Sequence, residues 1–247
     1  LIGDSEKINP ILDRLGYSGK MEMIEAKTTE AALAIMVDMA KRDEINAIMK
    51  GNMDTKDILG AVLKKENDLT STGVLNSITL SMVPSYHKLL MVADPGMIIV
   101  PTLEQKAGII HNCLRALRAI GYQKPKVAIL SCVEKVNPKI ESTMHASALM
   151  DMADAGVFGE CELYGPLSYD LIVNKEAAEI KGVDSPVCGD ADLVIVPDIN
   201  CGNTLVKCLS YTAGAVGGGV CLGAKMPVII PSRASSSDGK YYGIVIG

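Results

Sequence analysis

Short apolar runs alternate with longer stretches of helical periodicity along almost the whole chain, and this alternation limits the choice of fold more than any other feature. The apolar runs predict strands at 45–49, 78–83, 89–93, 127–130, 193–196 and 228–230. Apolar residues spaced by three and four predict helices at 29–41, 103–119, 141–154 and 203–213. Strands that alternate with helices are typical of an α/β fold, in which helices cover a central sheet.

The composition agrees with an α/β fold and limits the partners. Of 247 residues, 48% are hydrophobic, but there is no Trp and Phe158 is the single Phe, so aliphatic side chains must fill the core, as in a buried parallel sheet. The net charge of -5 argues against a broad nucleic-acid-binding surface, which needs clustered Lys and Arg. An anionic ligand therefore requires a locally positive site.

The seven cysteines lie mostly in apolar runs and form neither a CxxC pair nor a zinc-type spacing. We therefore expect reduced thiols in a cytoplasmic protein and no metal site. The uncharged stretch 208–224 contains five glycines and is too short for a typical membrane span. It predicts a buried helix, a turn and a strand, with no membrane partner.

Charged and turn-forming residues follow several of the predicted strands. They are Lys50-Gly51, Asp94-Pro95, Ser131, Pro197-Asp198 and Ser232-Arg233. In an open α/β sheet, ligands bind beyond the carboxyl ends of the strands. The two cations in this set could balance a phosphate, so the sequence predicts a cleft that binds anions.

The segment 231–238 carries the clearest anion-binding pattern, since hydroxyls and Arg233 follow a strand and Asp238 comes soon after. Arginine binds phosphate through a planar fork, and hydroxyls and backbone amides at a helix start add donors. A solvated serine-rich loop with a helix cap would give the same pattern. Ordinary turns, caps and surface lysines are likewise alternatives for Lys50, Lys139 and the segment 198–203.

Several catalytic motifs are absent from the sequence. There is no GxxxxGK[ST] phosphate loop, no GxGxxG fingerprint and no GxSxG nucleophile elbow. His87, His111 and His145 are far apart and adjoin no serine motif or HExxH pair. Nothing local therefore supports a Ser-His-Asp triad, a zinc site or dinucleotide binding.

Eight segments together resemble the phosphate acetyl/butyryltransferase family, and more closely its butyryl branch. They are 48–51, 103–107, 125–131, 134–139, 165–167, 190–198, 202–203 and 223–233, in order over essentially the whole chain. The resemblance implies a homodimer of chains with two three-layer α/β/α subdomains around a cleft, similar to the isocitrate and isopropylmalate dehydrogenases. Residues 1–103 plus 232–247 would form the first subdomain and 104–231 the second, with the family's opening strand and helix missing before Leu1.

The reaction that the resemblance implies is acyl-CoA plus phosphate to acyl phosphate plus CoA, without a covalent acyl-enzyme. Coenzyme A and phosphate are then substrates, and no cofactor is expected. The implied catalytic residues are Ser232 and Arg233, which would hold phosphate and the carbonyl oxygen, and Asp238, which would accept the thiol proton. The implied phosphate- and CoA-binding residues are Lys50, Gly51, Asp94, Lys139, Pro166, Asp198 and Asn203.

A preference for butyryl or branched acyl groups is the finer expectation, because Ile78 and Ile98 stand where family members have polar residues. A phosphate acetyltransferase is the main alternative. A metal-dependent decarboxylating dehydrogenase of the same architecture would need a cluster of carboxylates, which the resemblance does not place here. A non-catalytic homologue that binds acyl-CoA or phosphate is the remaining alternative.

Overall fold

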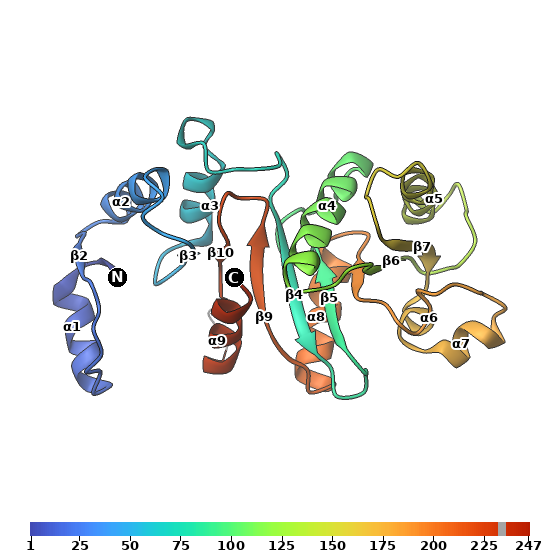
Figure 1. Ribbon diagram of the computed structural model, residues 1–247. Coiled ribbons are helices and arrows are strands. Elements are labelled where there is room, and N and C mark those ends of the chain that lie inside the picture. Colours follow the sequence, from blue (N-terminus) through green and yellow to red (C-terminus); the bar gives the residue numbers. More distant parts are fainter. Residues whose placement is uncertain (232–235) are drawn as a thin grey trace.

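The computed structural model describes residues 1–231 and 236–247 and is built around one eight-stranded sheet with helices on both faces (Figure 1). Its elements are β1 Ile2–Gly3, α1 Ser5–Arg14, β2 Ile24–Glu25, α2 Thr29–Lys41, β3 Ile48–Met49, α3 Thr55–Leu63, a 3-10 turn Lys65–Asn67, β4 Asn76–Met82, β5 Leu89–Ala93, α4 Leu103–Ala119, β6 Lys126–Leu130, α5 Glu141–Asp154, β7 Glu162–Leu167, α6 Tyr169–Val173, α7 Lys175–Ile180, β8 Leu193–Ile195, α8 Ile199–Thr212, β9 Val216–Leu222, β10 Val228–Ile229 and α9 Ser237–Ile246.

The strand order of the large sheet is β3-β10-β9-β4-β5-β8-β6-β7. Strands β3, β10 and β4 run in one direction, and the other five run in the opposite direction. A separate two-stranded sheet of β1 and β2 lies with α1 at one end of the molecule (Figure 1). The predicted α/β class is confirmed, with a mixed sheet whose fully parallel part is β5, β8, β6 and β7.

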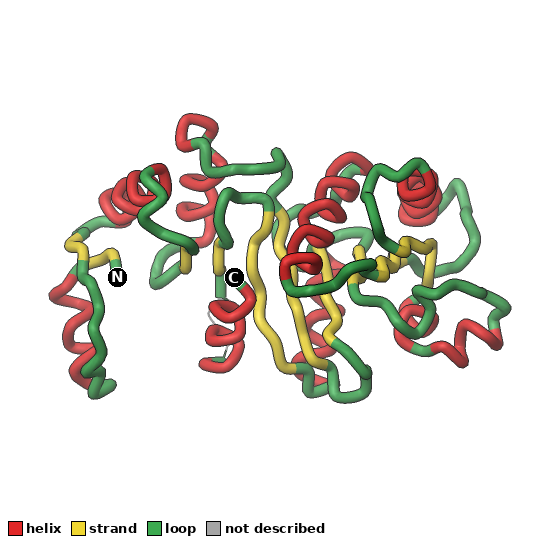
Figure 2. The backbone as a smooth tube through the Cα atoms, viewed as in Figure 1, coloured by secondary structure: helices red, strands yellow, loops and turns green. Residues whose placement is uncertain are grey.

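Alternating side chains of the parallel strands build two apolar clusters, one on each face of the sheet. On one face Ala93, Ile129 and Ile195 pack with α4 and α5. On the other face Val92 and Val194 pack with α6, α7 and α8. A third cluster joins α2 and α3 to the region around β3 and β10. Figure 2 shows the helices on both sides of these strands.

Four elements, α2, α4, α5 and β5, have the predicted bounds. Helix α8 begins four residues before the predicted start because the Asp198 carboxylate caps it, accepting from the amides of Asn200 at 2.8 Å and Cys201 at 3.0 Å. Strand β7 was not among the predicted strands, since Gly165-Pro166 lies within it. Proline is tolerated there because β7 is an edge strand, where a missing N–H need not break a ladder.

The predicted helix, turn and strand in 208–224 are confirmed as the end of α8, a turn and β9. No helix in the described part of the chain is long and apolar enough to cross a bilayer. All seven cysteines are free thiols. The division into subdomains at residues 103 and 232 stays a prediction; in the sheet, β9 and β10 lie between β3 and β4.

Candidate functional site

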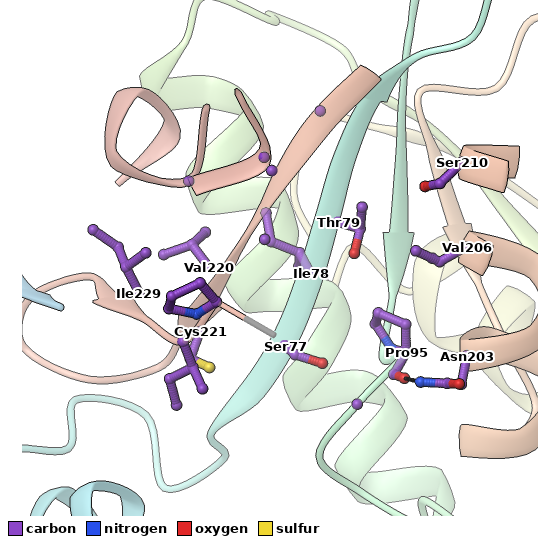
Figure 3. Close-up of a pocket in the computed structure, with 18 of the residues that line it drawn as sticks. Ser77, Ile78, Thr79, Pro95, Asn203, Val206, Ser210, Val220, Cys221 and Ile229 are labelled. Atoms are coloured by element: carbon purple, nitrogen blue, oxygen red, sulfur yellow. Dashed lines mark hydrogen bonds between the residues drawn. The ribbon is translucent and has the colours of Figure 1, made fainter. Parts of the chain in front are cut away.

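A cleft of about 1110 Å³ lies over β4 and β9 (Figure 3). The starts of α3 and α9 and one side of α8 form its walls. The turn 95–97 after β5 and residues 229–231 at the end of β10 also line the cleft. The cleft therefore joins segments that lie far apart in the sequence.

Three hydroxyl side chains, Ser77, Thr79 and Ser81, occupy alternate positions of β4 and line the cleft. Two of their three direct partners in β9 are glycines, Gly217 and Gly219, so the partner strand adds little side-chain cover. Between them, Ile78 and Leu80 belong to the core cluster beneath α4, and Ile78 is also part of the cleft lining. Figure 3 shows Ser77 and Thr79 on the side of the sheet that faces Asn203 and Val206.

Glycines in β9 allow backbone to approach backbone on two sides. A Cβ atom on Gly217 would lie 2.1 Å from the Leu80 carbonyl oxygen, and one on Gly218 would lie 2.3 Å from the Gly243 nitrogen. Both distances are far below any real Cβ contact. Strand β9 therefore packs closely against β4 and α9, which holds the start of α9 at the cleft.

Three lysines and two carboxylates are the charged groups among the described lining residues. Lys50 is only 8% exposed, and its Nζ donates to the carbonyls of Gly51 at 3.2 Å and Met53 at 3.1 Å. Within the described residues, no carboxylate lies within ion-pair distance of this ammonium. The other cations are the exposed Lys56 and Lys207, and the carboxylates are Asp54 and Asp238.

Two helix starts add partial positive charge to the cleft. Thr55 and Lys56 open α3, and Asp238 and Gly239 lie in the first turn of α9, whose cap is the Ser236 hydroxyl accepting from the Gly239 amide at 3.1 Å. The amides of a first helical turn point away from the helix and favour bound anions. Together with Lys50, this arrangement suits a ligand that carries several negative charges.

Three of the predicted site residues, Lys50, Asn203 and Asp238, line this cleft. The Asn203 side-chain amide donates to the Pro95 carbonyl at 3.3 Å (Figure 3). Ser232 and Arg233 lie outside the described residues. Their described neighbours Pro231 and Ser236 both line the cleft.

Asp94 lies behind the cleft wall rather than in its lining, with 2% of its surface exposed. Its carboxylate accepts from the Ser77 hydroxyl and from the amides of Gly96, Met97 and Ile98, the last three at 3.0 Å. These bonds fix the turn 95–98 and the position of Ser77. The structure thus gives Asp94 the geometry of a positioning residue.

The remaining predicted residues lie elsewhere. Gly51 and Lys139 are exposed and Pro166 is buried in β7, and none of the three is in the cleft lining. Asp198 lines a second cavity on the other side of α8.

Sequence reasoning missed Ser77, Thr79, Ser81, Lys207 and Ser210, all of which line the cleft. A signal was present at 77, 79 and 81, where hydroxyls recur with the period of a strand. For α8 there was a second signal, because the cleft-lining positions 203, 206, 207, 210 and 211 follow helical spacing. Which face of each element is open could not be known before the fold.

The chemistry available to the described lining residues is binding and polarisation rather than attack by the Cys221 thiolate. Burial, with a smaller effect of Asp94, raises the pKa of the Cys221 thiol to about 12, so this lining cysteine stays protonated at neutral pH. Among the described residues, no three His, Cys, Asp or Glu side chains are placed to hold a metal ion. The hydroxyls, lysines and amides can bind and polarise an anionic substrate.

Comparison with known proteins assigns the chain to a family. The model of the family described as Phosphate acetyl/butaryl transferase matches residues 4–247. A phosphate acetyltransferase of Thermotoga maritima is 36% identical over 246 residues, which cover 100% of this chain and 84% of that protein. A probable phosphate butyryltransferase of Bacillus subtilis is 37% identical over 246 residues, covering 100% of this chain and 82% of that protein.

A solved structure agrees with these relatives. The branched-chain phosphotransacylase from Enterococcus faecalis V583 superposes with a TM-score of 0.85 at 26% identity, over 100% of this chain and 97% of that one. The likeness therefore extends over the full length of the described fold.

Proposed function

The chain belongs to the phosphate acetyl/butaryl transferase family, and from that premise we propose that it moves a short acyl group between coenzyme A and inorganic phosphate in the cleft over β4 and β9. The observation that carries the proposal is the set of polar groups that line this cleft, namely three lysines, two helix starts and the hydroxyls of β4. Coenzyme A carries several phosphates, and inorganic phosphate is a further anion. A cleft of about 1110 Å³ is large enough for both.

The proposed reaction is direct transfer in a ternary complex. A phosphate oxygen attacks the thioester carbonyl carbon, the carbon–sulfur bond breaks, and the leaving sulfur takes a proton to become the thiol of coenzyme A. Holding the two reactants together can supply several kcal/mol of the barrier, about 7–11 in favourable cases. A protonated Cys221 agrees with a route that forms no acyl-cysteine.

We assign roles in this reaction to a few residues. Lys50 and Arg233 neutralise the phosphate, and Ser232 with nearby amides binds the carbonyl or phosphate oxygen. Asp238, in the first turn of α9 at the cleft, passes the proton that hydrogen phosphate loses to the leaving sulfur, and in the reverse direction it accepts the proton of the coenzyme A thiol. Asn203 and the turn held by Asp94 shape the wall against which the substrates lie. No cofactor takes part in this scheme.

The finer part of the proposal is a preference for butyryl or branched acyl groups. The relatives named above carry acetyl and butyryl names at nearly equal identity, and the matched structure is of a branched-chain enzyme. Apolar lining residues such as Leu59, Met97 and Val206 give a longer acyl chain a surface to bury. Of the two isoleucines that suggested this preference, Ile78 is in the cleft lining, although it is only 1% exposed. Ile98 does not support the preference, because it packs against the core and is not in the cleft lining.

The test is phosphate-dependent release of coenzyme A from acetyl-, butyryl-, isobutyryl- and isovaleryl-CoA, followed with a thiol reagent. We expect turnover that requires phosphate and survives exhaustive chelation. The values of kcat/KM should favour the four- and five-carbon substrates by about 1 to 3 kcal/mol per buried methylene. A higher value for acetyl-CoA would favour the acetyltransferase alternative, whereas binding without any release would favour a non-catalytic homologue. Light scattering of the purified protein tests the proposed homodimer.

A further inference from the structure

A second cavity, of about 870 Å³, lies on the opposite side of α8 from the reaction cleft. Residues 203, 206, 207, 210 and 211 of α8 line the cleft, whereas residues 200, 201, 204, 205 and 208 line the second cavity. The two sets occupy different sides of one helix, so α8 separates the two spaces.

The second cavity lies at a point where the topology of the sheet opens a crevice. The chain leaves β6 for α5 on one face of the sheet, and it leaves the neighbouring strand β8 for α8 on the other face. Residues 130–132 at the end of β6 and residues 197, 198 and 200 after β8 line the space between them. Open α/β sheets bind ligands in such crevices, beyond the carboxyl ends of the strands.

Lys106 of α4 is the one lysine or arginine in the described lining of this cavity, and it is only 4% exposed. Its Nζ lies 3.0 Å from His145 Nδ1, and within the described residues no carboxylate lies within ion-pair distance of it. Burial lowers the pKa of Lys106, an effect that Glu141 and Asp198 only partly oppose. A buried ammonium without a counter-ion is costly, so a bound anion would satisfy a group that the fold leaves unneutralised.

The two carboxylates near the cavity are engaged or turned to solvent. The Asp198 carboxylate caps α8 through the amides of Asn200 and Cys201. The Glu141 side chain is 75% exposed, and its carboxylate lies 3.8 Å from His145 Nε2. Neither neutralises Lys106 directly, but both would repel a ligand with a second negative charge.

The rest of the lining supplies hydrogen-bond donors and an apolar wall. Helix α5 begins at Glu141, and its N-cap residue Ile140 provides no side-chain cap. Next to this helix start, the hydroxyls of Ser131 and Ser142 lie 2.8 Å apart. Leu130, Tyr169 and Leu205 are among the apolar residues that form the wall. One positive charge surrounded by an apolar wall fits a small ligand that has one negative charge and an apolar chain.

We infer that the second cavity binds a small monovalent organic anion, a short apolar chain that ends in a carboxylate, with Lys106 as its counter-ion. Of the paired Ser131 and Ser142 hydroxyls, the one that accepts within the pair can donate to the carboxylate, and the chain lies against the apolar wall. A phosphate fits less well, because its second charge would meet Asp198 and Glu141. This binding site goes beyond the proposed reaction, which takes place on the other side of α8.

Three cysteines, Cys132, Cys201 and Cys208, line the second cavity and report on its occupancy. Cys161 is half-buried and lies outside this lining, so it serves as an internal reference. The experiment alkylates the native protein with iodoacetamide and follows each cysteine by peptide mass spectrometry. Butyrate should slow the alkylation of Cys132 and Cys201 relative to Cys161. Butyramide, which has the same chain without the charge, and inorganic phosphate should have much weaker effects.

Substitutions then locate the charge that is responsible. Lys106→Met should weaken the protection by butyrate about tenfold or more, whereas Lys225→Met, at an exposed pair with Asp68, should leave it unchanged. Lys50→Met in the reaction cleft should also retain it, which separates the two sites. Equal protection by butyramide, protection that survives Lys106→Met, or no protection in the wild-type protein would each overturn the inference. The comparison of butyrate with butyramide needs no variant and therefore stands even if Lys106→Met fails to fold.

Discussion

The two spaces that flank α8 hold positive charge in different ways. In the reaction cleft, Lys56 and Lys207 are exposed and Lys50 is buried. Hydroxyls of β4 and glycines of β9 also line this cleft. In the second cavity the charge is a single buried lysine, Lys106, with an apolar wall around it. Spread and solvated charge suits a large, flexible polyanion, while one desolvated charge suits a small monoanion. The difference predicts that replacing a lysine by methionine will have different effects on the two sides of α8.

The first part of this comparison concerns close backbone contact at glycine. Glycines of β9 line the reaction cleft and allow α9 to approach, whereas no glycine is in the described lining of the second cavity. In Gly218→Val, the new Cβ atom would lie 2.3 Å from the backbone nitrogen of Gly243. Helix α9 would therefore have to move. We expect a loss of about 3 kcal/mol or more in the free energy of unfolding, measured by urea denaturation.

Gly60→Ala is the matched control for this substitution. Gly60 lies within α3 and has nothing within 4 Å of its Cβ position, so alanine should stabilise the protein by about 0.5–1 kcal/mol. A Gly218→Val protein as stable as the wild type would show that α9 does not need the close approach.

Buried charge is the second part of the comparison, and Lys50 tests it in the reaction cleft. Lys50→Met removes an ammonium that donates to two carbonyls and has room for an anion. We expect kcat/KM for phosphate to fall about 10- to 100-fold, the equivalent of a lost charge-assisted hydrogen bond. Steady-state kinetics at varied phosphate measure this effect, with Lys225→Met as the control. An unchanged kcat/KM would remove Lys50 from the site.

The sequence identified lining residues of the two sites with unequal success, because the strand-end rule depends on the direction of the strands. The rule that ligands bind beyond strand ends led to Ser131 and Asp198, which line the second cavity, because β6 and β8 are parallel neighbours. The same rule could not place Lys50 relative to Asp94, since it takes no account of a reversal of strand direction within the sheet. The strand-end rule singled out Lys50, and the pattern in 231–238 included Asp238, but the assignment of both to one site came from the family resemblance, which already contains the fold.

Local patterns located the elements well but not the open faces. The helices α2, α4 and α5 have the predicted bounds because their apolar stripes are regular. The hydroxyls of β4 could be seen to share a face, yet nothing in the sequence shows that the face is uncovered between α3 and α8. That information depends on contacts between distant segments, such as Gly218 with Gly243. Ser232 and Arg233 lie outside the described residues, so their roles stay predictions.

Exposed charge in the reaction cleft should matter less than buried charge. Lys207 lies on the cleft side of α8 and is exposed, so its attraction for the phosphates of coenzyme A is screened by solvent and salt. Lys207→Met should raise the KM for acyl-CoA by roughly twofold to fivefold, and the effect should shrink at high ionic strength. A salt series of KM measurements for the wild type and the variant tests this. An effect that persists undiminished in high salt would mean that Lys207 makes a desolvated contact.

The smallest effect concerns the stability of the protein without a ligand in the second cavity. Burial lowers the pKa of Lys106 below its ordinary value of 10.5, and the charged groups that face it are Glu141 and Asp198, with His145 as its hydrogen-bond partner. Between the lowered pKa and 10.5, the unfolded chain binds more protons than the folded one, so wild-type stability rises with pH across that window. Lys106→Met keeps the unbranched shape and most of the length of the side chain but lacks this titration.

The variant should therefore gain up to about 1 kcal/mol over the wild type at pH 7, and the gain should shrink as the pH approaches 10.5. Urea denaturation of both proteins at several pH values measures the difference, and Lys225→Met in the same series accounts for the loss of one positive charge. If Lys106 were instead stabilised as a cation by its surroundings, Met would destabilise the protein at pH 7, and the deficit would shrink only at pH values above 10.5. That outcome would mean that the fold already neutralises Lys106, and the contrast between the two sides of α8 would then fail.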